Sequence, residues 1–355
     1  MTTPRLTCID WLKCLGMLLI VLGHTGGTSA QTVFPATPKQ LGVALFFFVL
    51  GFVLARDQRR PGRVVYNRLF DVYLFGGLCA VCLSAIMLVH SGTLNKSNYL
   101  PLLGGVNVVF NFYPANPSLW YLGTYLHLLL LWFVLARHWR IRAWMLVASA
   151  GIEIAVRALL FAAHTDYIAY MLLTNWITVF LAGMAAGQRW KEPPPRWTLA
   201  VGVTLLTGLF FIWSPAIQQF SLLPGFPFGR VVAGGQASSL LLTSACVSAL
   251  YLGATWLVFQ VTRHLGDFGL VRFLARNTLV VFLLQMPLIF ALSPYVHAVV
   301  QPGPVRILVN LAIYYLGLAL FSEVLRHVLQ PRRLRDWLAA RWNPPAAPKL
   351  ADGTT

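Results

Sequence analysis

The stretch Arg5–His24, which reads RLTCIDWLKCLGMLLIVLGH, decides the fold because it combines a membrane-helix composition with ionisable side chains. A transmembrane helix needs about 20 mostly apolar residues, and this stretch provides them. The exceptions within its apolar part are one acid, one base and one histidine, namely Asp10, Lys13 and His24. Because ionisable groups inside a bilayer are energetically costly, they mark a functional site by default.

Helix geometry relates these three side chains to one another. His24 follows Lys13 by eleven residues, which at about 100° per residue is about 20° past three full turns, so both lie on one face ~16 Å apart. Asp10 falls about 40° from His24 on the same side and can pair with Lys13 three residues later. The stretch therefore predicts a polar stripe along one helix face, with a lone histidine at its far end.

The composition indicates that the whole chain is a membrane protein. Of its 355 residues 58% are hydrophobic and 10% are charged, and the mean hydropathy is +0.69. A soluble domain typically has about 25% charged residues, so the composition excludes an ordinary soluble enzyme. The net charge of +17 falls in the connections between apolar segments, which favours topogenic and lipid-facing charge over nucleic-acid binding.

Apolar segments long enough to cross a bilayer recur along the chain. Two apolar stretches interrupted by Pro and Gly, 101–117 and 217–236, are predicted as loops. We predict an all-α polytopic bundle with about ten transmembrane helices, forming one membrane domain over 1–342 and followed by a disordered tail at 343–355. The ten predicted segments are 9–27, 39–56, 70–90, 118–136, 143–163, 168–188, 198–216, 237–261, 276–294 and 303–325.

The distribution of Lys and Arg predicts the orientation of this bundle. Positive charge gathers in alternate connections and in the C-terminal tail, whereas the opposite connections hold only Lys39, Lys96, Arg230 and Arg306. Since cytoplasmic loops carry the excess of Lys and Arg, both termini are predicted to be cytoplasmic. Lys13 would then lie in the inner half of the membrane and His24 in the outer half.

A resemblance to a known family rests on short motifs that occur in the same order. Ile9-Asp10 just before a basic residue, and ten residues between Lys13 and His24, resemble the opening of the acyltransferase-3 family, whose members are integral membrane acyltransferases that modify cell-surface sugars and related acceptors. The first predicted helix, which contains Asp10, Lys13 and His24, is the most specific match. Further stretches that are similar to the family are Phe46–Phe52, Arg68–Tyr73, Trp120–Leu122, Phe180–Gly187 and Phe282–Pro287.

Five positions depart from the family pattern. Two are aromatic or apolar changes, Leu74 in place of a Pro and Phe282 in place of a Tyr. Leu50 stands in place of a Ser, Asp71 in place of the second Arg of an Arg-x-x-Arg motif, and Gln285 in place of a His. Glutamine can form hydrogen bonds but cannot carry protons, so any chemical role of that second histidine would be missing here. These departures keep open the alternative of a degenerate relative that binds without catalysing.

The resemblance implies transfer of an acyl group, acetyl in the simplest case, from acyl-CoA to a hydroxyl of a cell-envelope sugar or polysaccharide. It also implies an integral protein of the bacterial plasma (inner) membrane. A hydroxyl that attacks a thioester must lose its proton, and the neutral imidazole of His24 is the side chain best suited to accept it near pH 7. We expect Asp10 and Lys13 to shape the polar path or to orient the donor. No Ser or Cys nucleophile is obviously paired with His24, which favours direct transfer.

The donor would need a site for its phosphates. Arg59, Arg60, Arg63 and Arg68 form a basic cluster after the second segment, and arginine suits phosphate because its planar guanidinium donates two hydrogen bonds at once. We therefore predict that this cluster binds acyl-CoA, with topogenesis as the alternative for each arginine. Asp71 can instead anchor Arg68 as an ion pair.

Five further residues are candidates for binding the substrates. Trp120 and Tyr121 can stack on a sugar or position the acyl group, although an interfacial aromatic belt also explains them. Glu153 and Arg157, four residues apart in an apolar segment, form either a buried structural pair or part of a polar cavity. Gln285 can donate or accept hydrogen bonds. No metal site is expected.

Two alternatives remain, one for the first segment and one for the function of the whole chain. A cleaved signal peptide could explain the first segment, with Thr28-Ser29-Ala30 as its cleavage site, but Asp10 and His24 fit that poorly. A transporter or flippase would suit many membrane segments and one polar helix. It would give no reason for the spacing of Lys13 and His24, and the sequence lacks the paired half-repeats that transporters often have.

Overall fold

The computed structural model describes residues 6–25, 38–109, 116–190 and 237–342, together with positions 197, 199, 200 and 202–204. Within these residues the regular structure is entirely helical. The longer helices are α1 (Thr7–His24), α3 (Pro38–Arg56), α4 (Pro61–Ser91), α5 (Trp120–Val134), α6 (Ala143–Ala162), α8 (Ile177–Gln188), α10 (Ala237–Thr262), α11 (Gly269–Val299), α13 (Leu318–Leu329) and α14 (Pro331–Trp342). Short helices are α7 (Asp166–Met171), α12 (Pro304–Leu311), the 3₁₀ turns η1 (Lys96–Leu102), η2 (Val106–Val108), η3 (Pro117–Leu119), η4 (Ala136–His138) and η5 (Leu173–Asn175), and the π-helix η7 (Ala312–Gly317).

The all-α polytopic architecture predicted from the sequence is confirmed. Among the described residues seven helical spans are long and apolar enough to cross a membrane, and α5 and α8 are shorter apolar helices. The predicted segment 198–216 lies largely outside the described residues, as do the predicted loop 217–236 and the predicted tail 343–355. The count of about ten spans and the cytoplasmic termini therefore stay predictions.

The predicted segment 168–188 is not one helix. α7 ends at Met171, and the 3₁₀ turn η5 separates it from α8. The cause is local hydrogen bonding, because the Asn175 amide and the Trp176 indole both donate to the Tyr170 carbonyl, at 3.2 and 2.9 Å. The interruption turns the Asn175 side chain into the bundle, where it accepts a hydrogen bond from Arg157.

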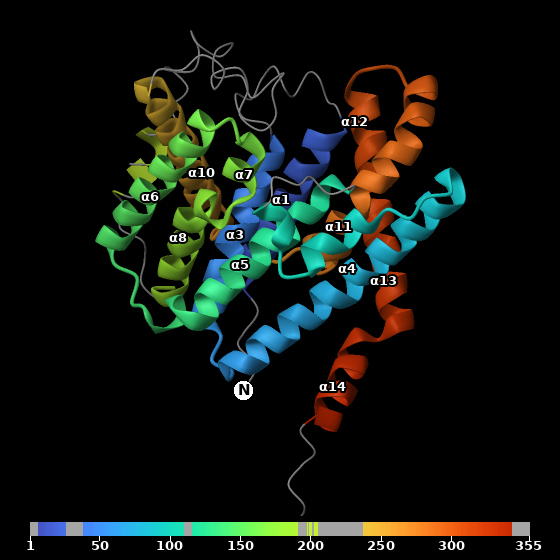
Figure 1. Cartoon of the computed structure of the whole chain (residues 1–355), viewed down its shortest axis with the longest axis horizontal. Coiled ribbons are helices and arrows are strands. Elements are labelled where there is room, and N and C mark those ends of the chain that lie inside the picture. The colour runs from blue at the N-terminus through green and yellow to red at the C-terminus, as the bar shows by residue number, and fades with distance from the viewer. Residues whose placement is uncertain are drawn as a thin grey trace, which may run out of the picture.

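Helix α3 lies between α1 and α8, with α6 and α10 on one side of the bundle and α11 and α13 on the other (Figure 1). Glycines allow the close approach of its neighbours. A methyl group at Gly42 would overlap the Gly16 carbonyl oxygen of α1, and one at Gly183 of α8 would overlap the Phe48 carbonyl oxygen of α3. Small residues at such crossings let helix backbones pack closely, which is a main source of helix association in membranes.

A proline positions the middle of α11. Pro287 has no backbone N–H, so the carbonyl of Leu283, four residues earlier, lacks its helical partner. The Asn116 amide donates to this oxygen at 2.8 Å, and the Cys79 thiol contacts it at 3.6 Å. Asn116 also accepts the Ser118 amide hydrogen at the start of η3. The loop before α5 is thus tied to α11 at Leu283, between Phe282 and Gln285.

The π-helix η7 brings two consecutive tyrosines into the bundle. Tyr314 and Tyr315 are both buried, and the Tyr315 hydroxyl donates to the Cys14 carbonyl of α1 at 2.9 Å. Further along the same surface the Asn310 amide contacts the Thr25 carbonyl at 3.5 Å. These bonds fix the last apolar helices of the chain against α1.

A buried ion pair joins α6 to α10 and to η5. Arg157 and Glu153 form a 2.5 Å salt bridge, and each side chain is only 1% exposed. Arg157 also donates to the Ser244 carbonyl and to the Ser248 hydroxyl, while that hydroxyl donates to Glu153. The guanidinium charge is therefore neutralised and hydrogen-bonded inside the protein, as a buried charge requires.

We expect Gly183→Ala to lower the thermal unfolding midpoint of the purified protein in detergent. The added methyl group would push α8 away from α3, and overpacking of this kind costs about 1–3 kcal/mol. The matched control is Gly151→Ala on α6, where an added methyl group meets nothing within 4 Å. Equal midpoints for the two variants would show that the α3–α8 contact is unimportant for stability.

We expect Arg157→Met to destabilise the protein more strongly, by about 3–5 kcal/mol, because it leaves the Glu153 carboxylate buried without its counter-charge. Asp336→Asn is the comparison, since it breaks the exposed Arg63–Asp336 pair, whose side chains are 43% and 58% exposed. Exposed pairs contribute about 0–1 kcal/mol. Thermal unfolding followed by size-exclusion chromatography measures both, and a similar small loss in each would contradict a stabilising role for the buried pair.

Candidate active site

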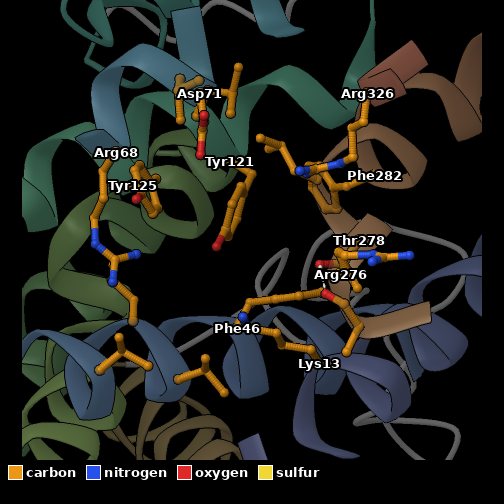
Figure 2. A pocket seen from close by; sticks show the side chains of 17 residues that line it. Lys13, Phe46, Arg68, Asp71, Tyr121, Tyr125, Arg276, Thr278, Phe282 and Arg326 are labelled. Carbon is orange, nitrogen blue, oxygen red and sulfur yellow. Dashed lines mark hydrogen bonds between the residues drawn. The ribbon is translucent and has the colours of Figure 1, made fainter. Parts of the chain in front are cut away.

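A cavity of about 340 Å³ lies among α1, α3, α4, α5, α11 and α13, each of which contributes side chains to its wall. Figure 2 shows Arg68 and Arg326 approaching it from opposite sides, with Tyr121 between them and Lys13 below. Among the described residues the charged lining consists of four cations and one carboxylate: Lys13, Arg68, Arg276, Arg326 and Asp71. The excess of positive charge suits an anionic ligand.

Two of these cations have hydrogen-bonding capacity that no described residue uses. The Nε atoms of Arg68 and Arg326 are buried and have no hydrogen-bond partner in the described part of the chain. Arg276 is instead held by a 2.9 Å ion pair with Glu323 of α13. Because guanidinium groups bind phosphate and carboxylate through planar pairs of hydrogen bonds, Arg68 and Arg326 are the cavity residues best prepared for such a ligand.

Three aromatic rings form one end of the cavity. Phe46 of α3, Tyr121 of α5 and Phe282 of α11 all line it. Their ring centroids are 6.2 Å apart for Phe46 and Tyr121, 6.3 Å for Phe46 and Phe282, and 4.8 Å for Tyr121 and Phe282. These distances are those of packed aromatic pairs, so the three rings are in mutual contact.

His24 ends α1 beside side chains of two neighbouring helices. The charge of Lys39 of α3 acts on the imidazole, and the Gln285 amide of α11 lies within reach of a polar contact with it. The His24 Nδ1 and both amide atoms of Gln285 are nevertheless buried without a hydrogen bond of ordinary geometry to any described residue. Buried polar atoms are seldom left unpaired, so the hydrogen-bonding atoms of His24 and Gln285 are candidates for contact with a further polar group.

The predicted catalytic residues divide between these two places. Lys13 lines the cavity, and His24 lies eleven residues further along the same helix, about 16 Å away along its axis. Asp10 is buried on α1, one turn before Lys13, and is not among the cavity-lining residues. One helix therefore connects the basic cavity to the histidine.

Only one member of the predicted arginine cluster lies at the cavity. Arg68 reaches the cavity, whereas Arg59, Arg60 and Arg63 are exposed around the α3–α4 connection and do not line it. Arg63 pairs with Asp336 at 3.0 Å, and Arg59 forms two hydrogen bonds with Asp57, of 2.8 and 2.5 Å.

The Arg59–Asp57 pair satisfies both charges. Partial burial alone would raise the pKa of the Asp57 carboxyl, but the hydrogen bonds and charge of Arg59 outweigh it and leave that pKa below its ordinary value. The same hydrogen bonds raise the pKa of the Arg59 guanidinium. Arg59 is thus already occupied by a stable counter-charge, which sets it apart from Arg68.

The predicted substrate-binding residues have different surroundings. Tyr121 lines the cavity, and Gln285 lies beside His24. Trp120 is buried against Tyr170, with ring centroids 4.6 Å apart, and does not line the cavity. Glu153 and Arg157 belong to the buried network of α6 and α10 and are likewise absent from the cavity wall.

Three of the departures from the family pattern, Leu50, Asp71 and Gln285, lie at the site. Leu50 and Asp71 both line the cavity, and Gln285 is fully enclosed next to His24. A substitution in the cavity wall changes the polarity that a ligand meets. These three departures therefore bear on ligand recognition more than on packing.

Sequence reasoning missed several residues of the site. Arg276 and Arg326 belong to the positive charge of the alternate connections and the C-terminal tail, which predicted only the orientation. Lys39 is one of the few cations of the opposite connections. The position of these cations at the ends of apolar segments gave no signal, because it is the packing of α11 against α4, and of α13 against α11, that brings Arg276 and Arg326 to the same cavity as Arg68. Phe46 and Phe282 fell within motifs that were recognised, but their mutual contact could not be derived from spacing.

The residues that the structure describes contain no group of three or more His, Cys, Asp or Glu side chains placed to hold a metal ion. Comparison with protein families finds that the model described as "Acyltransferase domain" matches residues 6–324. No curated protein and no solved structure matches the chain. The family match spans nearly the whole chain and contains His24 and every cavity-lining residue except Arg326. The chain therefore belongs to the acyltransferase-3 family of membrane acyltransferases.

Proposed function

We propose that this membrane acyltransferase moves an acyl group, acetyl in the simplest case, from acyl-CoA to a hydroxyl of a cell-envelope sugar or polysaccharide. The observation that carries the proposal is the arrangement along α1 of a basic cavity at Lys13 and a polar site at His24. A donor with an anionic head, a long thin arm and a reactive thioester at its tip fits this arrangement.

The anionic head of the donor would lie in the cavity. Arg68 and Arg326, whose Nε atoms lack partners within the described structure, would bind phosphate oxygens, with Lys13 adding a third positive charge. Asp10, one turn before Lys13, would orient that ammonium. The orientation predicted from Lys and Arg would open the cavity to the cytoplasm, where acyl-CoA is made.

The pantetheine arm of the donor would extend along α1 toward His24. The distance of about 16 Å from Lys13 to His24 is the reason an extended arm is needed. In the predicted orientation His24 lies in the outer half of the bilayer, so an acceptor sugar could approach it from the envelope side. The protein itself would be an integral protein of the bacterial plasma membrane.

In this proposal His24 acts as a general base. The acceptor hydroxyl would lose its proton to the imidazole while its oxygen attacks the thioester carbonyl carbon. The C–S bond then breaks, the new ester C–O bond remains, and the imidazolium returns the proton to the departing CoA thiolate. The Gln285 amide, which lies beside His24, would donate a hydrogen bond to the carbonyl oxygen, where negative charge develops during the attack.

With this role for Gln285, the replacement of the family's histidine by glutamine does not require the protein to be inactive. A glutamine cannot carry a proton, but the stabilisation of an oxyanion needs only a donor. A transporter or flippase, in contrast, would have no use for a general base and would transfer no label from acyl-CoA to an acceptor.

We expect His24→Ala to lower acyl transfer by about two to four orders of magnitude, since that is the usual effect of losing a general base. His24→Gln should fail equally, because it keeps hydrogen bonding but not basicity. The measurement is transfer of labelled acetyl from acetyl-CoA to envelope material in membranes with matched protein levels. His90→Ala, at an exposed position near the end of α4, is the control. Near-normal turnover by His24→Gln would disprove the role of His24 as base.

We expect Arg68→Ala and Arg326→Ala each to raise the KM for acyl-CoA about tenfold or more, because hydrogen bonds to charged groups contribute about 1.5–3 kcal/mol. The KM for the acceptor should change little. Arg60→Ala removes an exposed arginine outside the cavity and should have less than about a twofold effect. Steady-state kinetics rank the three variants, and the reverse order would move the donor site to the α3–α4 connection.

A further inference from the structure

The three aromatic rings line the cavity at its end nearest to His24 along α3 and α11. Along α3, Phe46 is the cavity-lining residue nearest to Lys39, the residue whose charge acts on His24. Along α11, Phe282 is the cavity-lining residue nearest to Gln285. On two different helices, therefore, an aromatic residue is the last that the cavity reaches before the His24 site.

Tyr121 provides the third ring at this end of the cavity. Tyr121 is the first cavity-lining residue of α5, and its ring contacts those of Phe46 and Phe282. It is supported from behind by Phe47, which stacks on it at 4.8 Å with an angle of 24° between the rings. A ring held on several sides cannot move away freely, so this end of the cavity is narrow and firm.

The side chains beyond the rings are buried. Gln285 follows Phe282 by three residues, which is about 4.5 Å along the helix axis. Gln285 is 0% exposed, as are Met17 and Val21 of α1. The Leu283 carbonyl between Phe282 and Gln285 is held by Asn116 at 2.8 Å, so α11 is fixed at this point.

We propose that Phe46, Tyr121 and Phe282 form a constriction that passes the pantetheine arm and selects short acyl groups for delivery to His24. This inference rests on the proposed use of acyl-CoA and deepens it by assigning the residues that set acyl-chain length. An acetyl group adds one methyl beyond the carbonyl carbon. A hexanoyl group adds five carbons, which must fold into the tightly packed space beyond the rings or remain among them.

Steric selection of this kind is effective because a packed interior does not expand easily. Interiors are close-packed, and forcing in extra methylene groups displaces side chains or backbone. Shortening one ring of the three should therefore admit a longer chain. A smaller residue at Phe282 is the most direct change, since this ring contacts both of the others.

The test is a competition between two donors. Membranes that contain the full-length protein receive an equimolar mixture of differently labelled acetyl-CoA and hexanoyl-CoA, and the ratio of the two labels in envelope material is measured. This ratio equals the ratio of kcat/KM values and does not depend on the amount of active protein. We expect the wild type to prefer acetyl, and Phe282→Ala to raise the hexanoyl-to-acetyl ratio by about tenfold or more.

The controls separate ring bulk from other effects. Phe290→Ala removes an exposed ring from the same helix and should leave the ratio unchanged. Tyr121→Phe removes a hydroxyl but keeps the ring, so the ratio should also stay near the wild-type value. Phe282→Leu serves if Phe282→Ala fails to accumulate, and a smaller increase in the ratio is then expected.

Two outcomes would overturn the constriction and leave the proposed function standing. A wild type that transfers hexanoyl as readily as acetyl shows that no size selection exists. A Phe282→Ala variant whose transfer falls for both donors at an unchanged ratio shows that the ring only supports packing. A wild type that transfers neither label contradicts the proposed function itself and removes the inference with it.

Discussion

The close approach of α3 to α1 and α8 is the constraint on which the rest of the structure depends. Gly42 and Gly183 allow carbonyl oxygens of neighbouring helices to lie where a side chain would otherwise be. With its flanks fixed in this way, α3 presents Lys39 near His24 at one end and Phe46 to Val53 along the cavity. The two parts of the candidate site therefore share one rigid helix, and their separation is set by backbone packing.

Apolar surroundings make the few buried charges informative. The charge of Arg157 is neutralised by Glu153 and hydrogen-bonded within its own network, so it needs no ligand. Arg68 and Arg326 keep buried Nε atoms without partners in the described structure, although Asp71 lies in the same cavity. Because unpaired buried polar atoms are costly, the difference between these arginines distinguishes a structural ion pair from a binding site.

The sequence predicted the class of fold and the helix that carries the histidine, because hydrophobic composition and the spacing of Lys13 and His24 are properties of a single segment. It could not predict the cavity, whose cations come from α1, α4, α11 and α13. Neither could it separate Arg68 from Arg59, because the pairing of Arg59 with Asp57 and the inward direction of Arg68 depend on side-chain geometry. The break between α7 and α8 was missed because Asn175 and Trp176 act through hydrogen bonds to one carbonyl, which hydrophobicity does not reveal.

Because of the π-helix Ala312–Gly317, the orientation of α13 depends on the exact number of residues in this segment. A π-helical turn contains one residue more than an α-helical turn, and this π-helix separates α13 from Asn310, which is bonded to α1. Loss of a single residue from the segment would restore an α-helix and rotate everything after it by about 100°. Arg326 would then leave the cavity wall although no residue of the site had been changed. Natural relatives with a one-residue deletion at this point would need a different cation opposite Arg68.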